Sequence, residues 1–425
     1  MGVLGIGHKY FFKNNAYWKT TLAASSNETD WTAQKLNAQR SLIPQSTISV
    51  TNANLVLSSF INKTFSPKHT NKTGILVTGM LYDLLLKKSF APEAPPKEIV
   101  NSDGFSTLLS AFSSSAVNLT PKLLMNIGVN AQLFTLNDHY TVEPRLGFRY
   151  QIKQNHALGL AYGLHSRLES LNFHFNNSLN SDAKAVNKDL DFTKSHHLVL
   201  SYDWNVSDLV HVKIEPYYQQ LFSVPVMANS SLSFLNLTND WFFAEKLQNT
   251  GEGRNYGIDL TLEKYMSKGY YYMLTGSLFQ SEYKGGDGVW RDTRFNRNYI
   301  VNFLIGKEWQ MGRENQNTLS VNLRATNQGG NRYSPVNEAA SKAAKDVVFD
   351  ETKAFSGQAD PSLNVHFTAS YKINKKKSSR EIALKILNLT SQPDFNGFKY
   401  NFIDKKVDKD LATILIPNLS YKIEF

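Results

Sequence analysis

The last thirteen residues, TILIPNLSYKIEF (Thr413–Phe425), decide how the chain folds. Side chains that are apolar or carry a ring occupy every second position, namely Leu415, Pro417, Leu419, Tyr421, Ile423 and Phe425. Polar side chains fall on the other face at Asn418, Ser420, Lys422 and Glu424, and this period of two predicts a strand with one apolar and one polar face. Long strands of this kind, repeated many times, are typical of outer-membrane barrels, whose apolar face meets lipid and whose polar face lines the lumen.

The same alternation recurs along the whole chain and predicts about 17 strands. Short turns alternate with long links, which we expect at about 28–52, 87–103, 170–193, 222–253, 284–295, 330–361 and 391–411. Short turns at one end and long loops at the other are the outer-membrane arrangement. The sequence therefore predicts an all-β chain, residues 1–425, that forms one transmembrane antiparallel barrel domain. Pro144 lies inside one of the strands, and we expect a register irregularity there because proline lacks a ladder N–H.

Composition excludes several other classes of protein. There is no run of about 18 apolar residues, as a membrane-spanning helix needs, and the densest apolar patch is 79–86. The chain has no cysteine, which excludes disulfide frameworks and thiolate metal sites. Its formal net charge is +10, but the basic residues are scattered apart from Lys375–Lys377 and no nucleic-acid motif accompanies them. We therefore predict no nucleic-acid partner.

The strand count also bears on closure of the barrel. With an odd number of antiparallel strands the first and last point the same way, so pairing them requires a parallel seam. An open edge in lipid leaves backbone groups unpaired at high cost. Met1–Phe12 shows neither the basic region nor the apolar core of a signal peptide. We expect the domain to be N-terminally incomplete, with further strands before the first.

Four segments between residues 251 and 335 carry a family resemblance. They read GEGRNYGIDLTLEK, GYYYMLTGSLFQSEYKGGDGVWRDTRFNRNY, GKEW and GGNRYSP. This set closely resembles the C-terminal barrel of TonB-dependent outer-membrane receptors, and most closely the subgroup with a carboxypeptidase-regulatory-like domain before the plug. GHKYFF and AYWKTTLAAS near the start resemble the middle of the same barrel.

The resemblance implies a barrel of 22 strands around a plug domain, of which this chain supplies the C-terminal part. It implies energy-coupled uptake of a specific ligand across the outer membrane of a Gram-negative bacterium, with the TonB complex and the plug as partners of the full-length protein. It also implies that Tyr421, Ile423 and Phe425 form a signal for the barrel-assembly machinery. The ligand is not implied by any residue, and neither plug nor TonB box is in this sequence.

Candidate ligand-binding residues lie in the long loops and at their edges. They are Trp241, Phe242, Phe243, Arg254, Tyr283, Trp290, Arg291, Arg294, Arg332 and Tyr333. Arginine with tryptophan is suited to clamp an anionic or planar ligand by forked hydrogen bonds and stacking. The alternative is that these residues only order the loops on the barrel rim. On the polar strand faces, the resemblance implies that Glu143, Arg145, Asp259 and Glu263 face the plug.

No catalytic or metal-binding constellation stands out. Asp287 and Asp292 lack the spacing of a calcium loop, and His196 and His197 are adjacent on a strand, so they point to opposite faces. We predict no metal, no cofactor and no enzyme activity. Besides the transporter, two hypotheses stay open: a passive outer-membrane pore, and a surface ligand-binding protein without transport.

Overall fold

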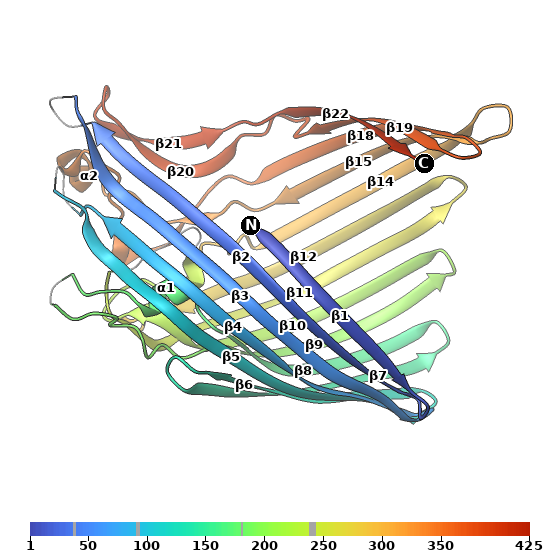
Figure 1. Ribbon diagram of the computed structural model, residues 1–425. Coiled ribbons are helices and arrows are strands. Elements are labelled where there is room, and N and C mark those ends of the chain that lie inside the picture. The colour runs from blue at the N-terminus through green and yellow to red at the C-terminus, as the bar shows by residue number, and fades with distance from the viewer. Residues whose placement is uncertain (37–39, 91–93, 180–181, 238–243) are drawn as a thin grey trace.

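The computed structural model describes residues 1–36, 40–90, 94–179, 182–237 and 244–425. Its main element is an 18-stranded sheet in which every pair of neighbours is antiparallel (Figure 1). The strands are β1 (Gly2–Phe12), β2 (Ala16–Leu36), β3 (Leu42–Ser66), β4 (His69–Lys88), β5 (Lys97–Thr120), β6 (Leu123–Phe134), β7 (His139–Lys153), β8 (His156–Arg167), β9 (Thr193–Ser207), β10 (Val210–Met227), β11 (Leu247–Ser267), β12 (Tyr270–Lys284), β13 (Trp290–Asp292), β14 (Tyr299–Met311), β15 (Asn317–Gln328), β18 (Ser362–Asn374), β19 (Ser379–Leu387) and β22 (Ile416–Glu424).

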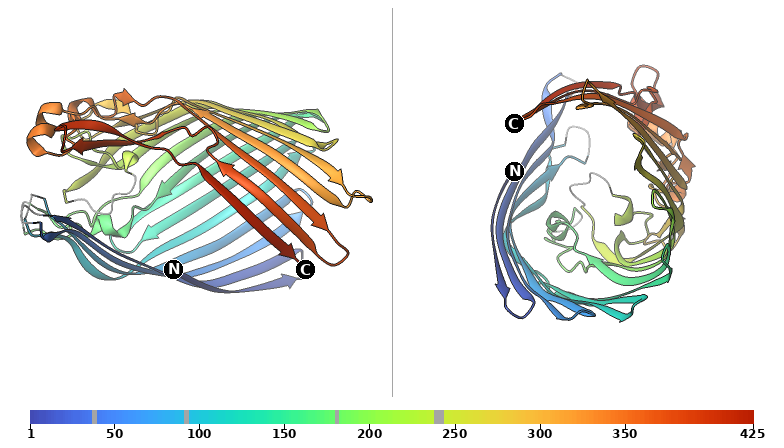
Figure 2. Two further views of the ribbon diagram at one scale, coloured as in Figure 1. Left: turned by 90° about the horizontal axis from the view of Figure 1, so that it is seen from above. Right: turned by 90° about the vertical axis from the view of Figure 1, so that its right-hand side faces the viewer.

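The predicted fold class and strand count are confirmed. Only β13, with three residues, is short; the other 17 strands of this sheet, all within the described part of the chain, have nine residues or more. The sheet curls into a barrel-shaped wall (Figure 2). On β11 the side chains of Tyr256, Ile258 and Leu260 are exposed on the outer face, whereas Asn255 and Asp259 line a pocket on the inner face. This alternation follows from the pleat of the strand.

The first and last strands form the two edges of the sheet. Within the described residues β1 pairs only with β2, and β22 pairs only with β19. The two chain ends lie on either side of the resulting gap in the wall (Figure 2). β1 and β22 are the first and the last of 17 long strands that alternate strictly in direction, so they run in the same direction.

Smaller elements lie in the connections at the long-loop end. They are α1 (Leu171–His174), η1 (Phe234–Asn236), β16 (Arg332–Tyr333), α2 (Glu338–Ala344), η2 (Glu351–Lys353), β17 (Gly357–Gln358), β20 (Asp394–Asn401) and β21 (Lys406–Ala412). β16 pairs with β17, and β20 pairs with β21 in a separate hairpin. Among the described residues no helix has the length and apolar character that a membrane span requires.

Several predicted loop boundaries are wrong because the strands extend further than their apolar pattern. The expected loop 28–52 is mostly strand, since β2 runs to Leu36 and β3 begins at Leu42, and the two strands are paired there with one register shift between Ala33 and Gln34. β5 begins inside the expected loop 87–103, and β10 and β11 shorten the expected loop 222–253. The segment 391–411 contains the β20–β21 hairpin. The extension of β2 is largely polar, whereas β3 and β5 carry buried residues there, Ile48, Val50 and Ile99, that pack in the core cluster with the inserted segment.

Pro144 does not disturb the pairing of β6 with β7. The register is continuous there, with Val129 opposite Pro144, so the irregularity expected from the sequence is absent from this described pair. On the other side of β7, pairing with β8 begins at Arg145. Pro144 therefore lies one residue outside the ladder to β8.

The segment 168–192 folds into the mouth of the barrel, with 180–181 not described (Figure 2). Its side chains join two apolar clusters. Leu171, Phe175 and Phe192 pack on inward-facing residues near the ends of β3, β4 and β5, including Leu84 and Leu86. A second cluster joins Phe173, Leu190, Val224, Phe234 and Leu247. The apolar core thus lies between the wall and this inserted segment, and it fixes one side of the mouth.

Candidate ligand-binding site

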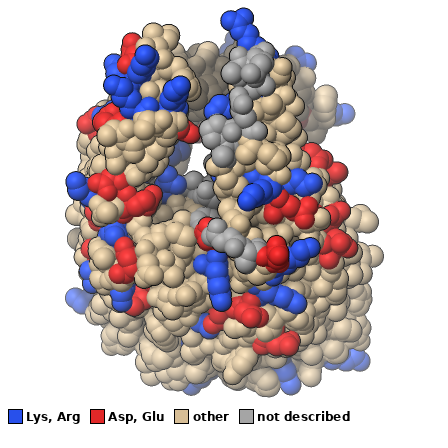
Figure 3. Space-filling view, turned by 90° about the vertical axis from the view of Figure 1, so that its left-hand side faces the viewer, with Lys and Arg blue, Asp and Glu red and all other residues tan. Residues whose placement is uncertain are grey.

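A pocket opens among the loops at the long-loop end, and we call it the mouth pocket. It has a volume of about 490 Å³ and is formed by η1, the β12–β14 connection, the β15–β18 connection and the β20–β21 hairpin. Its lining includes Ser231, Ser233, Asn236, Arg294, Phe295, Arg332, Tyr333, Phe349, Glu351, Phe355, Phe395 and Phe398. Acidic and basic residues are interspersed around the hollow at this end (Figure 3).

Aromatic rings from two connections meet in the mouth pocket. The ring of Tyr333 lies 5.3 Å from Phe395 and 5.1 Å from Phe398, and the Phe349 ring lies 6.3 Å from Phe398. These tilted and edge-to-face arrangements are the favourable ones for ring pairs. They tie the β20–β21 hairpin to the β15–β18 connection and leave a wall of flat apolar surfaces.

The polar side chains of the mouth pocket are largely held by one another. Arg332 lies 3.2 Å from a carboxylate oxygen of Asp292 and donates to the Asn296 carbonyl and the Asn298 side chain. Ser231 donates to Glu351 at 2.7 Å. Asn236 is 7% exposed; its Oδ1 accepts from the Arg294 backbone N–H at 2.9 Å, while its Nδ2 has no hydrogen-bond partner in the described part of the chain.

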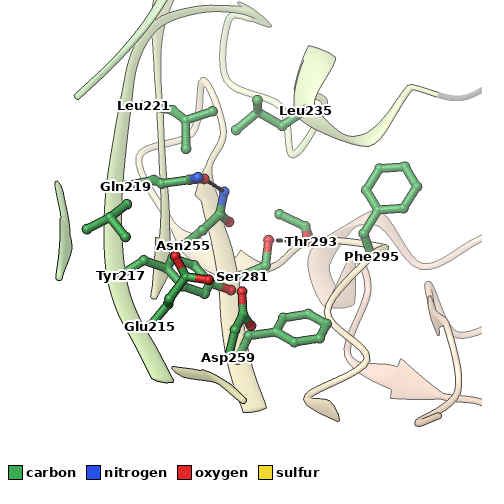
Figure 4. A pocket seen from close by; sticks show the side chains of 12 residues that line it. Glu215, Tyr217, Gln219, Leu221, Leu235, Asn255, Asp259, Ser281, Thr293 and Phe295 are labelled. Atoms are coloured by element: carbon green, nitrogen blue, oxygen red, sulfur yellow. Dashed lines mark hydrogen bonds between the residues drawn. The ribbon is translucent and has the colours of Figure 1, made fainter. Parts of the chain in front are cut away.

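A second pocket lies below, against the inner face of β10, β11 and β12, and we call it the lumen pocket (Figure 4). Its volume is about 560 Å³, and it is lined by Val199, Glu215, Tyr217, Gln219, Leu221, Leu235, Asn255, Asp259, Phe279, Ser281, Thr293 and Phe295. Asn255 donates to Gln219 at 3.1 Å, and the Ser281 and Thr293 hydroxyls lie 2.8 Å apart. Asp259 accepts from Ser277 at 2.6 Å.

The arginines predicted to clamp a ligand are mostly engaged in the rim itself. Arg291 is paired with Asp287 through two hydrogen bonds of 3.0 and 2.6 Å, and this pairing holds the pKa of the Asp287 carboxyl below its usual range. Arg254 pairs with Glu282 and lies over the Trp290 ring at 4.6 Å. These contacts order the β12–β14 connection, which is what the alternative interpretation predicts.

The other predicted residues fall in different places. Arg294, Arg332 and Tyr333 line the mouth pocket, whereas the Tyr283 ring is completely buried near Phe355. Trp241, Phe242 and Phe243 lie outside the described residues.

The residues predicted to face a plug are on the inner face of the wall, but they differ in accessibility. Glu143 is 1% exposed and accepts hydrogen bonds from Ser166, Gln132, Asn130 and Arg145. The Arg145 side chain remains half-exposed. Asp259 lines the lumen pocket, and Glu263 follows on the same face of β11, opposite His211.

Sequence reasoning missed Asn236, Phe295 and the pair Phe395 and Phe398. The two phenylalanines stand in a loop segment with Tyr400 and Phe402, and this aromatic density in a polar stretch was a usable signal. Phe295 lies beside Arg294 in one of the quoted motifs, so it could have been found in the same way. Asn236 had no such signal, because its role depends on segments far apart in the chain. In the described residues no group of three or more His, Asp or Glu side chains is placed to hold a metal ion.

Solved structures with the same fold are outer-membrane receptors. The pyoverdine outer membrane receptor FpvA from Pseudomonas aeruginosa superposes on 100% of this chain with a TM-score of 0.70 and 10% identity. The siderophore receptor PiuA from Acinetobacter baumannii and the ferric-catecholate import receptor Fiu from E. coli K12 each match 99% of it, with TM-scores of 0.69 and 0.67 and identities of 13% and 11%.

This chain spans 61%, 64% and 63% of the length of FpvA, PiuA and Fiu, respectively. The sequence matches no protein-family model and no curated protein. The shared fold is that of the barrel of TonB-dependent receptors, as the sequence resemblance predicts. These three structural relatives are receptors and not enzymes.

Proposed function

We propose that this chain, which has the fold of a TonB-dependent receptor barrel, forms part of the wall of an outer-membrane receptor that takes up a specific ligand. The observation that carries the proposal is the stacking of two pockets along one side of the wall. The mouth pocket lies among the loops, and the lumen pocket lies directly inside it on β10, β11 and β12. A ligand captured by the loops would enter the lumen along this side.

Uptake through such a barrel requires a plug and a source of energy. We propose that a plug domain packs against the inner face of the wall, where Arg145, Asp259 and Glu263 offer charged groups, and that the TonB complex supplies the coupling. Glu143 supports the plug-facing surface indirectly, because its oxygens orient Gln132, Asn130 and Arg145.

The proposal also accounts for the two free edges of the sheet, at β1 and β22. The outer edges of β1 and β22 each carry a row of backbone groups that pair with no described strand. In lipid such edges are too costly to persist. We propose that further strands of the same protein complete the barrel between them.

The outer face fits a location in the outer membrane of a Gram-negative bacterium. Leu419, Tyr421 and Ile423 of β22 are exposed on the outer face, and Phe425 is fully exposed at the chain end. We propose that the outer face contacts lipid and that this terminal stretch is bound by the barrel-assembly machinery. Deletion of Phe425 should then lower the amount of heat-modifiable, folded protein in outer membranes, while total synthesis is unchanged.

The decisive experiment is uptake by cells that carry the full-length gene. A radiolabelled ligand should accumulate only while the proton gradient is intact, and accumulation that survives an uncoupler would contradict energy coupling. A passive pore is the second candidate, because the mouth is hollow in the space-filling view (Figure 3). Stable conductance of the purified protein in planar bilayers would favour it, and binding without either uptake or conductance would favour surface capture.

A further inference from the structure

The positive charge of the chain is concentrated at the short-turn end of the barrel, on the right in Figure 1. Eight short turns lie there, and each is counted here with four residues on either side: 9–19, 63–72, 117–126, 150–159, 204–213, 264–273, 308–320 and 371–382. These 86 of the 425 residues hold 17 of the 46 Lys and Arg but only 4 of the 36 Asp and Glu. The rest of the chain has 29 basic and 32 acidic residues, so the excess positive charge belongs to this end.

Three lysines come together at the β11–β12 turn. The Lys264 Nζ lies 3.8 Å from the centre of the Tyr270 ring, and the Lys307 Nζ lies 5.6 Å from the same ring and 6.0 Å from that of Trp309. Lys307 also donates to the backbone carbonyl of Lys268 at 3.1 Å. Ring faces hold ammonium groups by cation–π attraction. We call Lys264, Lys268 and Lys307, with these two rings, the lysine cluster.

The lysine cluster contains no carboxylate. In the described part of the chain none of its three ammonium groups forms an ion pair, whereas at the long-loop end of the same two strands Arg254 pairs with Glu282 and Lys284 pairs with Glu252. Ammonium groups gathered around one ring repel each other, and the repulsion grows as water is excluded. An anion bound between them would remove this cost, so the arrangement indicates a negatively charged ligand.

The ammonium groups also keep hydrogen-bond donors for such a ligand. Lys264 donates to the backbone carbonyls of Tyr265 and Tyr270, each at 3.2 Å, and Lys307 donates to that of Lys268. Each ammonium group has three N–H donors. Lys264 therefore retains at least one donor and Lys307 at least two.

The position of the lysine cluster indicates which anion it meets. On β11, Ile258 and Leu260 are exposed on the outer face, and Lys264 follows four residues later on the same face; on β14, Lys307 follows the exposed Ile305 in the same way. Outward side chains change from aliphatic to aromatic and basic where acyl chains give way to headgroups. The short turns of an outer-membrane barrel face the periplasm, so these are the headgroups of the periplasmic leaflet.

We propose that the lysine cluster binds the phosphate of an anionic phospholipid in the periplasmic leaflet. Lys264 and Lys307 are its ammonium ligands, and Tyr270 and Trp309 lie beside the upper part of the acyl chains. A zwitterionic lipid carries the same phosphate together with a cation of its own, which the three lysines repel, so the site selects an anionic headgroup. The inference rests on the proposed membrane location and not on uptake.

The test is native mass spectrometry of the purified full chain in detergent, titrated with phosphatidylglycerol and with phosphatidylcholine of identical acyl chains. The chain should retain phosphatidylglycerol preferentially. Lys264→Gln and Lys307→Gln should each weaken that binding about fivefold, and the double variant about 25-fold, as expected for basic residues near an anionic surface. Glutamine keeps most of the apolar stem that packs on the rings.

The matched control removes the same charge at the long-loop end. Lys342→Gln combined with Lys345→Gln changes two exposed lysines at α2 and its C-terminal cap, and it should leave the affinity for both lipids unchanged.

Equal affinity of the wild-type chain for the two lipids would overturn the proposal, and so would a preference that the double variant retains. Displacement of phosphatidylglycerol by millimolar inorganic phosphate would also overturn it, because the lysines would then hold a free anion and not a lipid. The outcome is separable from that of the proposed function. Lipid selectivity without gradient-dependent uptake refutes transport and leaves the lipid site, whereas uptake without lipid selectivity refutes the site and leaves transport.

Discussion

Replacing Phe175 by alanine should release the segment 168–192 from the barrel wall. The Phe175 side chain is 8% exposed, its ring centroid lies 4.9 Å from that of Tyr82, and it belongs to the cluster with Leu84 and Leu86. Truncation of a buried phenylalanine costs about 3 to 5 kcal/mol. Because the rest of the wall is held by strand ladders, we expect this cost to appear as easier local opening of the segment and not as loss of the barrel.

Amide hydrogen exchange measures this opening directly. A decrease of about 3 kcal/mol in the local opening free energy corresponds to at least a hundredfold faster exchange, since each 1.4 kcal/mol is about tenfold. Peptides covering 171–179 should show the acceleration, and peptides of β14 and β15 should not. Phe402→Ala is the matched control, because that ring is 66% exposed at the tip of the β20–β21 hairpin. Unchanged exchange in 171–179 would refute the argument that the cluster anchors this segment.

Two further perturbations probe the rim. Hydrogen bonding to Arg291 is the chief cause of the lowered pKa of Asp287. The stabilisation from this pair is therefore complete above the carboxyl's unfolded pKa and is lost as pH falls through its lower folded pKa. Amide exchange of 285–295, corrected for intrinsic rates, should accelerate in acid, and Asp287→Asn should remove that pH dependence. A Cβ at Gly330 would collide with the Ala359 carbonyl, so Gly330→Ala should cost about 1 to 3 kcal/mol and make 330–361 protease-sensitive, whereas Gly276→Ala, with open space around it, should not.

The fold could be predicted because its evidence is local. The outward-facing residues of β22, such as Leu419, Tyr421 and Ile423, alternate with polar ones within one strand, and a period of two needs no knowledge of partners. The same logic failed for residues 28–52. The polar stretch Glu28–Asp30 shows no alternation but keeps its ladder to β3. The alternation of Ile48 and Val50 on β3 reflects burial against the inserted segment, which lies far away in the sequence.

The site could be predicted only in part, since it is assembled from segments distant in sequence. Arg294 and Tyr333 could be predicted because they lie in motifs. Asn236 could not, because its contact is with the Arg294 backbone N–H, 58 residues away in the sequence. Arg291 shows the opposite error. Its partner Asp287 is four residues away, and a closed ion pair at that spacing explains the residue without any ligand.

Inward-facing positions carry information that the outward pattern hides. Near the mouth the inner faces of β3 and β4 are apolar, with Val50, Leu84 and Leu86, and there the inserted segment packs. On β10 and β11 the inner face is polar, with Gln219 and Asp259, and there the lumen pocket remains open. An apolar residue facing a watery lumen would be unfavourable unless something covered it. Apolar inward positions near a barrel mouth therefore indicate where an inserted loop docks, and polar inward positions indicate the side left to the ligand.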